Sequence, residues 1–229
     1  MRRTLKLVVG ALVLVVLAAV GFAAWYVFGD PAPAKPELST DAPTSRGGPA
    51  TPEGAWKIKP VARVFVGYRI KELFGDAVLK RDAAGRTNRV SGTLTIANGR
   101  VTQAVVTADI SELDSGRAAR DSYTRDNALE SSRFPTARFT LTAPIALPAH
   151  LAKGRRVHTQ ARGVLLLHGV THAVVITLDA RWNGPTIDAV GSAPIVLSDF
   201  KIDAPDTPIA KVDDHGSLEL DLEFVPAAG

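Results

Sequence analysis

The stretch Leu218-Glu-Leu-Asp-Leu-Glu-Phe224 alternates apolar and acidic residues without a break. Successive side chains of a β-strand point to opposite faces, so this pattern predicts a strand with one face towards a core and the other towards solvent. A second stretch, residues 62–71, shows the same alternation. Its expected solvent-facing residues are Arg63, Arg69 and Lys71. Its expected inward positions are Ala62, Val64, Val66, Tyr68 and Ile70.

The rest of the chain after residue 56 continues this pattern, and helical periodicity is weak. Further strands are expected at 90–96, 100–110, 136–142, 156–167, 171–182 and 186–195. Asn98-Gly99 and His168-Gly169 predict tight turns between neighbouring strands. Residues 111–135 break the alternation and predict a long crossover with room for a short helix. The sequence therefore predicts an all-β fold of about eight antiparallel strands, in a closed barrel or a sandwich.

Several inward positions of the expected barrel carry small residues. Ala104 and Ala108 lie on one strand, Ala161 and Gly163 on a second, and Ala189, Gly191 and Ala193 on a third. An eight-stranded barrel can be filled by its side chains or can hold one small ligand. Small residues favour an apolar cavity, although large neighbours could interdigitate with them and close the space.

The N-terminus has the pattern of a membrane anchor. Residues 7–28 contain neither a charge nor a proline, and they are numerous enough to cross a bilayer as a helix. Arg2, Arg3 and Lys6 precede this stretch and Asp30 follows it, which predicts a cytoplasmic N-terminus and an extracytoplasmic remainder. A cleaved signal peptide would have a shorter apolar stretch, so an uncleaved signal anchor over residues 1–28 is expected.

Residues 29–55 are rich in Pro, Ala, Gly, Ser and Thr. Such a composition buries too little apolar surface to fold alone, so it predicts a linker between the membrane and one folded domain, residues 56–229. The expected location is the cytoplasmic membrane, crossed once, with the C-terminal domain outside the cytoplasm.

Composition excludes several classes of function. The chain of 229 residues has no cysteine, which removes disulfide scaffolds, thiolate nucleophiles and Cys-ligated metals. Its net charge of +4 includes +3 from residues 1–28, and no basic block remains to select a nucleic acid. No Gly-x-Ser-x-Gly motif is present, and Asp213-Asp214 has no sequence context that predicts a shifted pKa. The sequence predicts no enzyme, no catalytic residue, no cofactor and no nucleic-acid partner.

Three segments resemble the YceI-like family in order and spacing. The run from Arg162 to Leu178, with its His168-Gly-Val-Thr turn, is similar to the family's signature hairpin, and Trp56-Lys-Ile-Lys is similar to its opening. Arg125-Asp126 followed by Phe134-Pro-Thr-Ala-Arg-Phe139 resembles a third block. The resemblance implies a lipocalin-like antiparallel barrel outside the cytoplasm. It also implies a lumen that binds a polyisoprenoid or a related amphiphile, such as an isoprenoid quinone.

The expected ligand contacts are inward apolar residues, assigned from strand parity: Val64, Tyr68, Leu94, Phe139, Leu165, Leu167, Ile176, Trp182 and Phe224.

Two polar residues are candidates for the barrel mouth. Arg125 in Arg125-Asp126, like Arg120 in Arg120-Asp121, could hold an oxygen-rich headgroup or could form a structural ion pair in the crossover. His168 could lie at the mouth, but its place in a turn favours a hydrogen bond to backbone. No metal site is predicted, since His168 and His172 have no third ligand nearby in sequence.

Two functions fit these patterns. The first is a membrane-tethered, non-catalytic protein that holds a long-chain lipid in an apolar barrel. The alternative is a filled barrel that serves as an interaction module for an envelope protein complex. An open apolar lumen distinguishes the first from the second. The oligomeric state is not predicted by any pattern in the chain.

Overall fold

The computed structural model describes residues 14–18, 21, 31–39, 47–74, 79–206 and 210–227. It divides into two units, residues 1–32 and 33–229, which are considered separately. In the first unit residues 14–18 are helical, and most of the expected anchor lies outside the described residues. Within the described ranges no helix has the length and hydropathy needed to span a bilayer. The anchor therefore stays a prediction.

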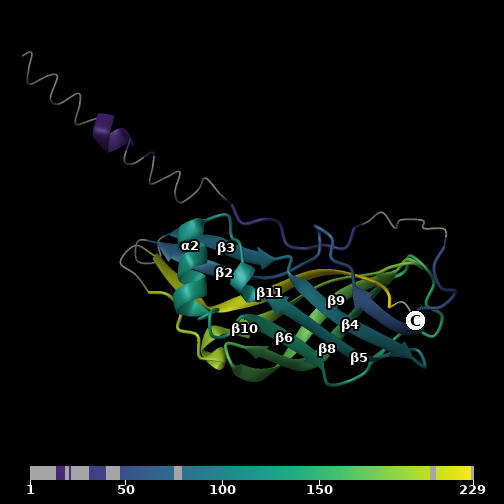
Figure 1. Cartoon of the computed structure of the whole chain (residues 1–229). Coiled ribbons are helices and arrows are strands. Elements are labelled where there is room, and N and C mark those ends of the chain that lie inside the picture. Colours follow the sequence, from purple (N-terminus) through teal and green to yellow (C-terminus); the bar gives the residue numbers. More distant parts are fainter. Residues whose placement is uncertain are drawn as a thin grey trace, which may run out of the picture. The chain divides into compact units, whose positions relative to one another are not determined.

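The second unit is an antiparallel β-structure (Figure 1). Its strands are β1 (Gly54–Ile58), β2 (Phe65–Phe74), β3 (Leu79–Thr87), β4 (Val90–Ala97), β5 (Arg100–Asp109), β6 (Thr136–Leu141), β7 (Ile145–Ala146), β8 (Arg156–Leu167), β9 (Val170–Trp182), β10 (Ile187–Val196) and β11 (Ala210–Pro226). Its helical segments are η1 (Ile110–Glu112), α2 (Ala118–Tyr123), η2 (Thr124–Ala128) and η3 (Leu197–Phe200).

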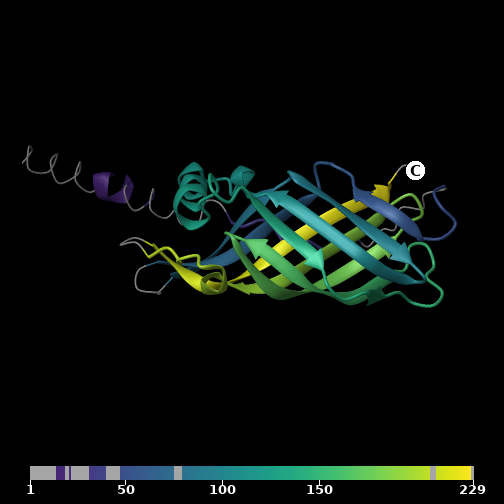
Figure 2. The same ribbon diagram turned by 60° about the horizontal axis from the view of Figure 1, so that its bottom comes forward.

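The sheet closes into a barrel of eight strands, in the order β1, β4, β5, β6, β8, β9, β10, β11 and back to β1 (Figure 2). Because β11 is long, β1 pairs with its last residues and β2 pairs with the rest of the same edge. The β2–β3 hairpin thus extends the wall at one end. The expected all-β antiparallel barrel of about eight strands is confirmed.

The predicted strands correspond closely to β2, β4, β5, β6, β8, β9, β10 and the second half of β11. The pattern did not indicate β1, β3 or the first half of β11, since Leu79–Thr87 has no clear alternation. Ala62 is a wrong assignment: it lies in the turn before β2 and is exposed. The crossover contains η1, α2 and η2, which confirms the expected short helix.

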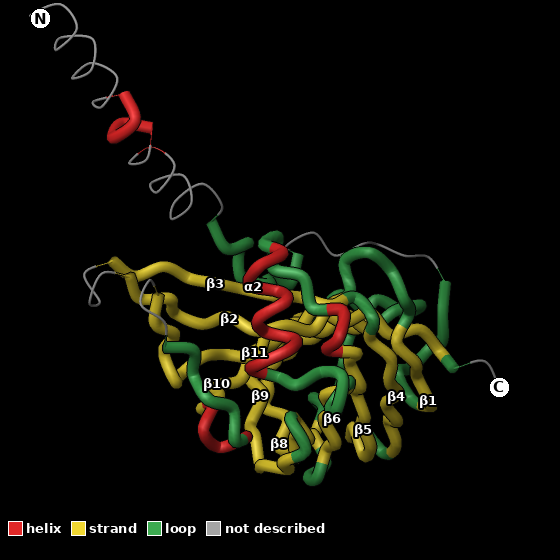
Figure 3. Tube along the Cα trace, turned by 60° about the vertical axis from the view of Figure 1, so that its left-hand side comes forward, coloured by secondary structure: helices red, strands yellow, loops and turns green. Residues whose placement is uncertain are grey.

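The interior holds two apolar clusters. One lies at the end of the barrel that α2 and η2 cover, and Figure 3 looks towards this α2 end. It joins Leu113 and Leu129 from the crossover to Phe139 and Leu165 on the strands. The other lies at the opposite end around Trp56 and Trp182, which we call the tryptophan end. The crossover is therefore part of the core at this end of the barrel.

Part of the outer wall differs from the solvent-facing surface that alternation predicts. Arg69 and Glu219 are only 8% and 2% exposed, and the Arg69 guanidinium donates to both carboxylate oxygens of Glu219 at 2.5 and 3.1 Å. Arg63 is exposed, as expected, and pairs with carboxylates including Asp188 and Asp221. Lys71 is exposed, as expected, and pairs with Asp82. The expectation for Arg69 was wrong because residues 33–39 cover this wall.

The turn between β8 and β9 gives a test of the packing at the α2 end. His168 and Gly169 both have positive φ, as do Asn98 and Gly99 in the turn between β4 and β5. A Cβ on Gly169 would lie 2.7 Å from the Phe134 ring, whereas a Cβ on Gly99 would meet nothing within 4 Å.

We expect Gly99→Ala to cost about 1 kcal/mol of unfolding free energy, from backbone strain alone. Gly169→Ala adds the clash with Phe134 and should cost ~1–3 kcal/mol more. Urea denaturation of both variants measures the difference. Equal losses in the two variants would show that the ring contact is unimportant.

Candidate functional site

The structure places the predicted ligand-contact residues inside the barrel. Eight of the nine are buried, with exposed fractions between 0% for Val64 and 9% for Phe139. Phe139, Leu165, Leu167 and Ile176 belong to the cluster at the α2 end, and Tyr68 packs against them. Val64, Leu94, Trp182 and Phe224 belong to the cluster at the tryptophan end. Eight of the nine lie on strands and follow the predicted parity, whereas Val64 is buried just before β2 and belongs to no strand. Contact of the nine residues with a ligand stays a prediction.

The small inward residues do not all widen the lumen. A Cβ on Gly163 would lie 2.4 Å from the Phe139 ring, and a Cβ on Gly191 would lie 2.5 Å from a methyl group of Leu178. Large side chains from adjacent strands thus occupy the space above both glycines. At Gly163 and Gly191, therefore, large side chains interdigitate with the small residues, which was the alternative to an open cavity.

Between the two clusters, three inward leucines are less buried than their neighbours. Leu178, Leu218 and Leu220 are half-buried, whereas Ile176 and Leu222 on the same strands are 6% and 3% exposed. Leu220 packs against both clusters. By strand parity these three side chains lie on the inner face of the sheet, together with Ile176 and Leu222. These leucines form an apolar surface that a lumen ligand could cover.

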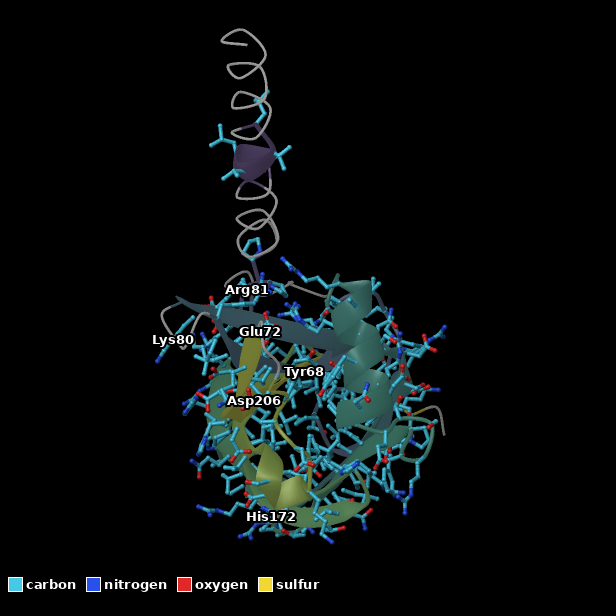
Figure 4. The ribbon with its side chains drawn as sticks, turned by 90° about the vertical axis from the view of Figure 1, so that its left-hand side faces the viewer. Tyr68, Glu72, Lys80, Arg81, His172 and Asp206 are labelled. Carbon is cyan, nitrogen blue, oxygen red and sulfur yellow. The ribbon has the colours of Figure 1, made fainter. Side chains whose placement is uncertain are left out.

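A polar cluster lies next to this surface at the α2 end. Figure 4 faces that end and labels Tyr68, Glu72 and Arg81. Arg81 donates to Glu72 at 2.6 Å, and Arg120 of α2 donates to both oxygens of Glu72 at 2.8 and 3.0 Å. Glu72 has the inward parity of Tyr68 and lies directly opposite Arg81 in the β2–β3 register. The cluster thus joins α2 to the inner face of the barrel wall.

Tyr68 connects this polar cluster to the apolar interior. Its ring lies over Gly85 of β3, where a Cβ would be 2.6 Å from the ring. Its side chain is hydrogen-bonded with Thr124 of η2. Burial raises the pKa of the Tyr68 phenol above its ordinary value, and the hydrogen bond with Thr124 and the charge of Arg120 offset only part of the rise. Tyr68 therefore stays protonated near neutral pH.

The two residues predicted at the mouth have different positions. His168 is 11% exposed, with Nδ1 3.0 Å from the Phe200 carbonyl oxygen and Nε2 2.9 Å from Glu130. It also packs edge-on against Phe134. The expected hydrogen bond to backbone is present, with its acceptor in η3, and this fixes the turn to two neighbouring segments. The predicted contact of His168 with a headgroup is not tested by this geometry.

Arg125 is half-buried in η2, and no described carboxylate lies within ion-pair distance of it. Arg120 instead reaches the inner cluster, and its partner is Glu72 rather than the adjacent Asp121. Asp121 accepts hydrogen bonds from the backbone N–H and hydroxyl of Ser115. Sequence reasoning missed Glu72 and Arg81, although a charge at the inward position after Ile70 was a usable signal.

The described residues contain no group of three or more His, Asp or Glu side chains arranged to hold a metal ion. His172 is exposed and packs edge-on against Phe200. The chemistry available in the interior is apolar contact, with hydrogen bonding from Tyr68 and the two arginines at one end.

A model of the YceI-like domain matches residues 56–224, which is most of the described barrel. The chain belongs to the YceI-like domain family. No curated protein is significantly similar to this chain.

Solved structures show the same YceI-like fold at low sequence identity. A polyisoprenoid-binding domain from Saccharophagus degradans, implicated in plant cell wall breakdown, is 18% identical, with a TM-score of 0.58. The match covers 76% of this chain and 100% of that domain. BcnA from Burkholderia cenocepacia is 19% identical, with a TM-score of 0.51, and the match covers 68% of this chain and 95% of BcnA. These likenesses establish the fold of the YceI-like domain.

The burial of Tyr68 gives a test of the polar cluster. The chain has three tyrosines, and Tyr68 should titrate above the ordinary range in a spectrophotometric titration of the phenolates. Because the folded protein binds this proton more tightly than the unfolded chain does, the unfolding free energy should fall as the pH rises from about 10 through the raised pKa.

Tyr68→Phe should remove both the late phase of the titration and this loss of stability. Tyr123→Phe is the control, because Tyr123 is exposed, and it should leave both in place. A late phase that persists in Tyr68→Phe would contradict the assignment.

Proposed function

We propose that this protein is a non-catalytic lipid-binding protein that holds a polyisoprenoid or a similar long-chain amphiphile in its barrel. The observation that carries the proposal is the row of half-buried inward leucines between two apolar clusters. Each methylene of a chain that leaves water for such a surface contributes about 0.8 kcal/mol, without any covalent chemistry. Membership of the YceI-like family and the fold shared with a polyisoprenoid-binding domain support the same function.

The orientation of the ligand follows from the two ends of the barrel. The tryptophan end is apolar, whereas Tyr68 and the Arg81–Glu72–Arg120 cluster supply hydrogen-bonding groups at the α2 end. An amphiphile would therefore place its chain along the leucines and its headgroup beneath α2. An isoprenoid or an isoprenoid quinone fits this description.

The proposed location is the outer side of the cytoplasmic membrane. It is supported by the apolar stretch of residues 7–28 and by the three basic residues before it. A tether of this kind would keep a lipid-binding barrel close to the bilayer from which its ligand comes.

Filling the lumen tests the lipid function. Leu220→Trp adds bulk between the two clusters and should lower the affinity for a long-chain isoprenoid roughly tenfold, equivalent to the lost burial of about two methylenes. Leu166→Trp is the matched control, because Leu166 faces outward and is 38% exposed. Native mass spectrometry of protein purified without detergent, followed by organic extraction, measures bound lipid, and thermal unfolding checks that both variants fold.

Wild-type protein without extractable lipid, and without uptake of offered isoprenoids, would contradict this function. That result would favour the filled barrel as a protein interaction module, for which the side chains above Gly163 and Gly191 are the present support.

A further inference from the structure

Residues 33–39, which we call the strap, run along the outside of the barrel (Figure 1). Three arginines on the outer wall donate to strap carbonyl oxygens. Arg69 of β2 donates to Pro33 at 2.6 Å, and Arg86 of β3 donates to Ala34 at 2.7 Å. Arg181 of β9 donates to Ser39 at 2.7 Å. The strap therefore crosses the wall from the β2–β3 hairpin to β9.

One strap side chain is buried. Leu38 is 6% exposed, although it lies outside the barrel and most of the strap is exposed. Val190 and Asp188 on β10 have outward parity, yet they are only 5% and 7% exposed. Asp188 is covered by its polar partners Arg63 and Asn183. The burial of the apolar Val190 and Leu38 indicates apolar packing of the strap in addition to the three arginine contacts.

The strap also completes the buried ion pair of Arg69 and Glu219. A guanidinium buried without partners for its donors is costly, and Arg69 uses two donors for Glu219. The Pro33 carbonyl accepts from its Nη2 atom as well, while Arg86 lies 3.5 Å from the same Glu219 and 4.0 Å above the Phe65 ring. Arg69 and Arg86 thus each divide their hydrogen bonds between the barrel and the strap.

Docking of the strap shortens the tether. The predicted membrane segment ends at Phe28, so only residues 29–32 separate it from the strap. The five steps from Phe28 to Pro33 can span at most about 18 Å. A freely moving linker of residues 29–55 would have a typical end-to-end distance of roughly 30 Å.

We infer that the strap holds the β2–β3 wall of the barrel at the membrane surface, so that the partner of this wall is the lipid bilayer. The inference rests on the proposed membrane tether. Tyr68 and Glu72 lie on the inner face of the same wall, so the polar end of the lumen is kept near the source of an amphiphilic ligand.

The experiment compares one insertion at two positions in the full-length protein. About ten Gly-Ser residues are inserted either between Ala32 and Pro33 or between Thr44 and Ser45. Because the chain has no cysteine, a fluorophore can be attached at Lys71→Cys, two residues from Arg69. Energy transfer to acceptor lipids in phosphatidylethanolamine–phosphatidylglycerol nanodiscs reports the distance between this label and the bilayer.

We expect the insertion before the strap to increase this distance by about 10 Å, and the insertion after the strap to leave it unchanged. A label at Ala152→Cys, near the tryptophan end, should lie farther from the bilayer than the label at position 71. Equal effects of the two insertions, or protein that is not retained in the nanodisc, would overturn the inference.

Two point variants provide a second test. Leu38→Asn should release the strap, so that the insertion after it also increases the distance. Lys35→Asn, at an exposed strap position, should leave the strap docked. An unchanged distance in Leu38→Asn with the later insertion would also overturn the inference. Lipid extracted from the same samples tests the proposed function separately. A barrel without lipid can still lie at the membrane surface, and a barrel with bound lipid can lie away from it.

Discussion

Closure of the sheet between β1 and β11 is the constraint on which the interior depends. Only three residue pairs make this contact, from Trp56 opposite Pro226 to Ile58 opposite Phe224. Trp56 supports it, being 1% exposed and donating from its indole N–H to the Pro52 carbonyl at 2.8 Å. Once the sheet is closed, every second residue of the eight strands must face a single lumen. The apolar clusters and the leucines between them follow from this parity.

Strand parity is also the part of the structure that the sequence predicts well. Alternation in stretches such as Leu218–Phe224 is a local property, so it identifies strands and their inward faces without knowledge of their partners. Seven of the nine predicted ligand-contact residues lie on the eight barrel strands for this reason, whereas Tyr68 lies on the inner face of β2 and Val64 is buried just before β2. The width of the lumen is different, because it depends on which side chain lies above each glycine. Phe139 above Gly163 is a cross-strand contact that no local pattern specifies.

The sequence could not predict the polar cluster at the α2 end or the burial of Arg69 on the outer wall, because both depend on contacts between distant segments of the chain. Glu72, Arg81 and Arg120 come from β2, β3 and α2, and their meeting depends on how the crossover folds over the barrel. Arg69 has outward parity, and alternation alone makes an outward arginine solvent-facing. In the folded chain Arg69 is buried, bound to Glu219 and to the Pro33 carbonyl of residues 33–39, a segment whose composition is that of a linker.

The pairing within the polar cluster at the α2 end holds its side chains in fixed orientations. Glu72 accepts hydrogen bonds from the guanidinium groups of Arg81 and Arg120, which fix its orientation. Burial raises the pKa of the Tyr68 phenol, so this group stays protonated and can donate a hydrogen bond. The α2 end therefore presents oriented hydrogen-bonding groups beside an apolar wall, which is the arrangement that the proposed binding of an amphiphile requires.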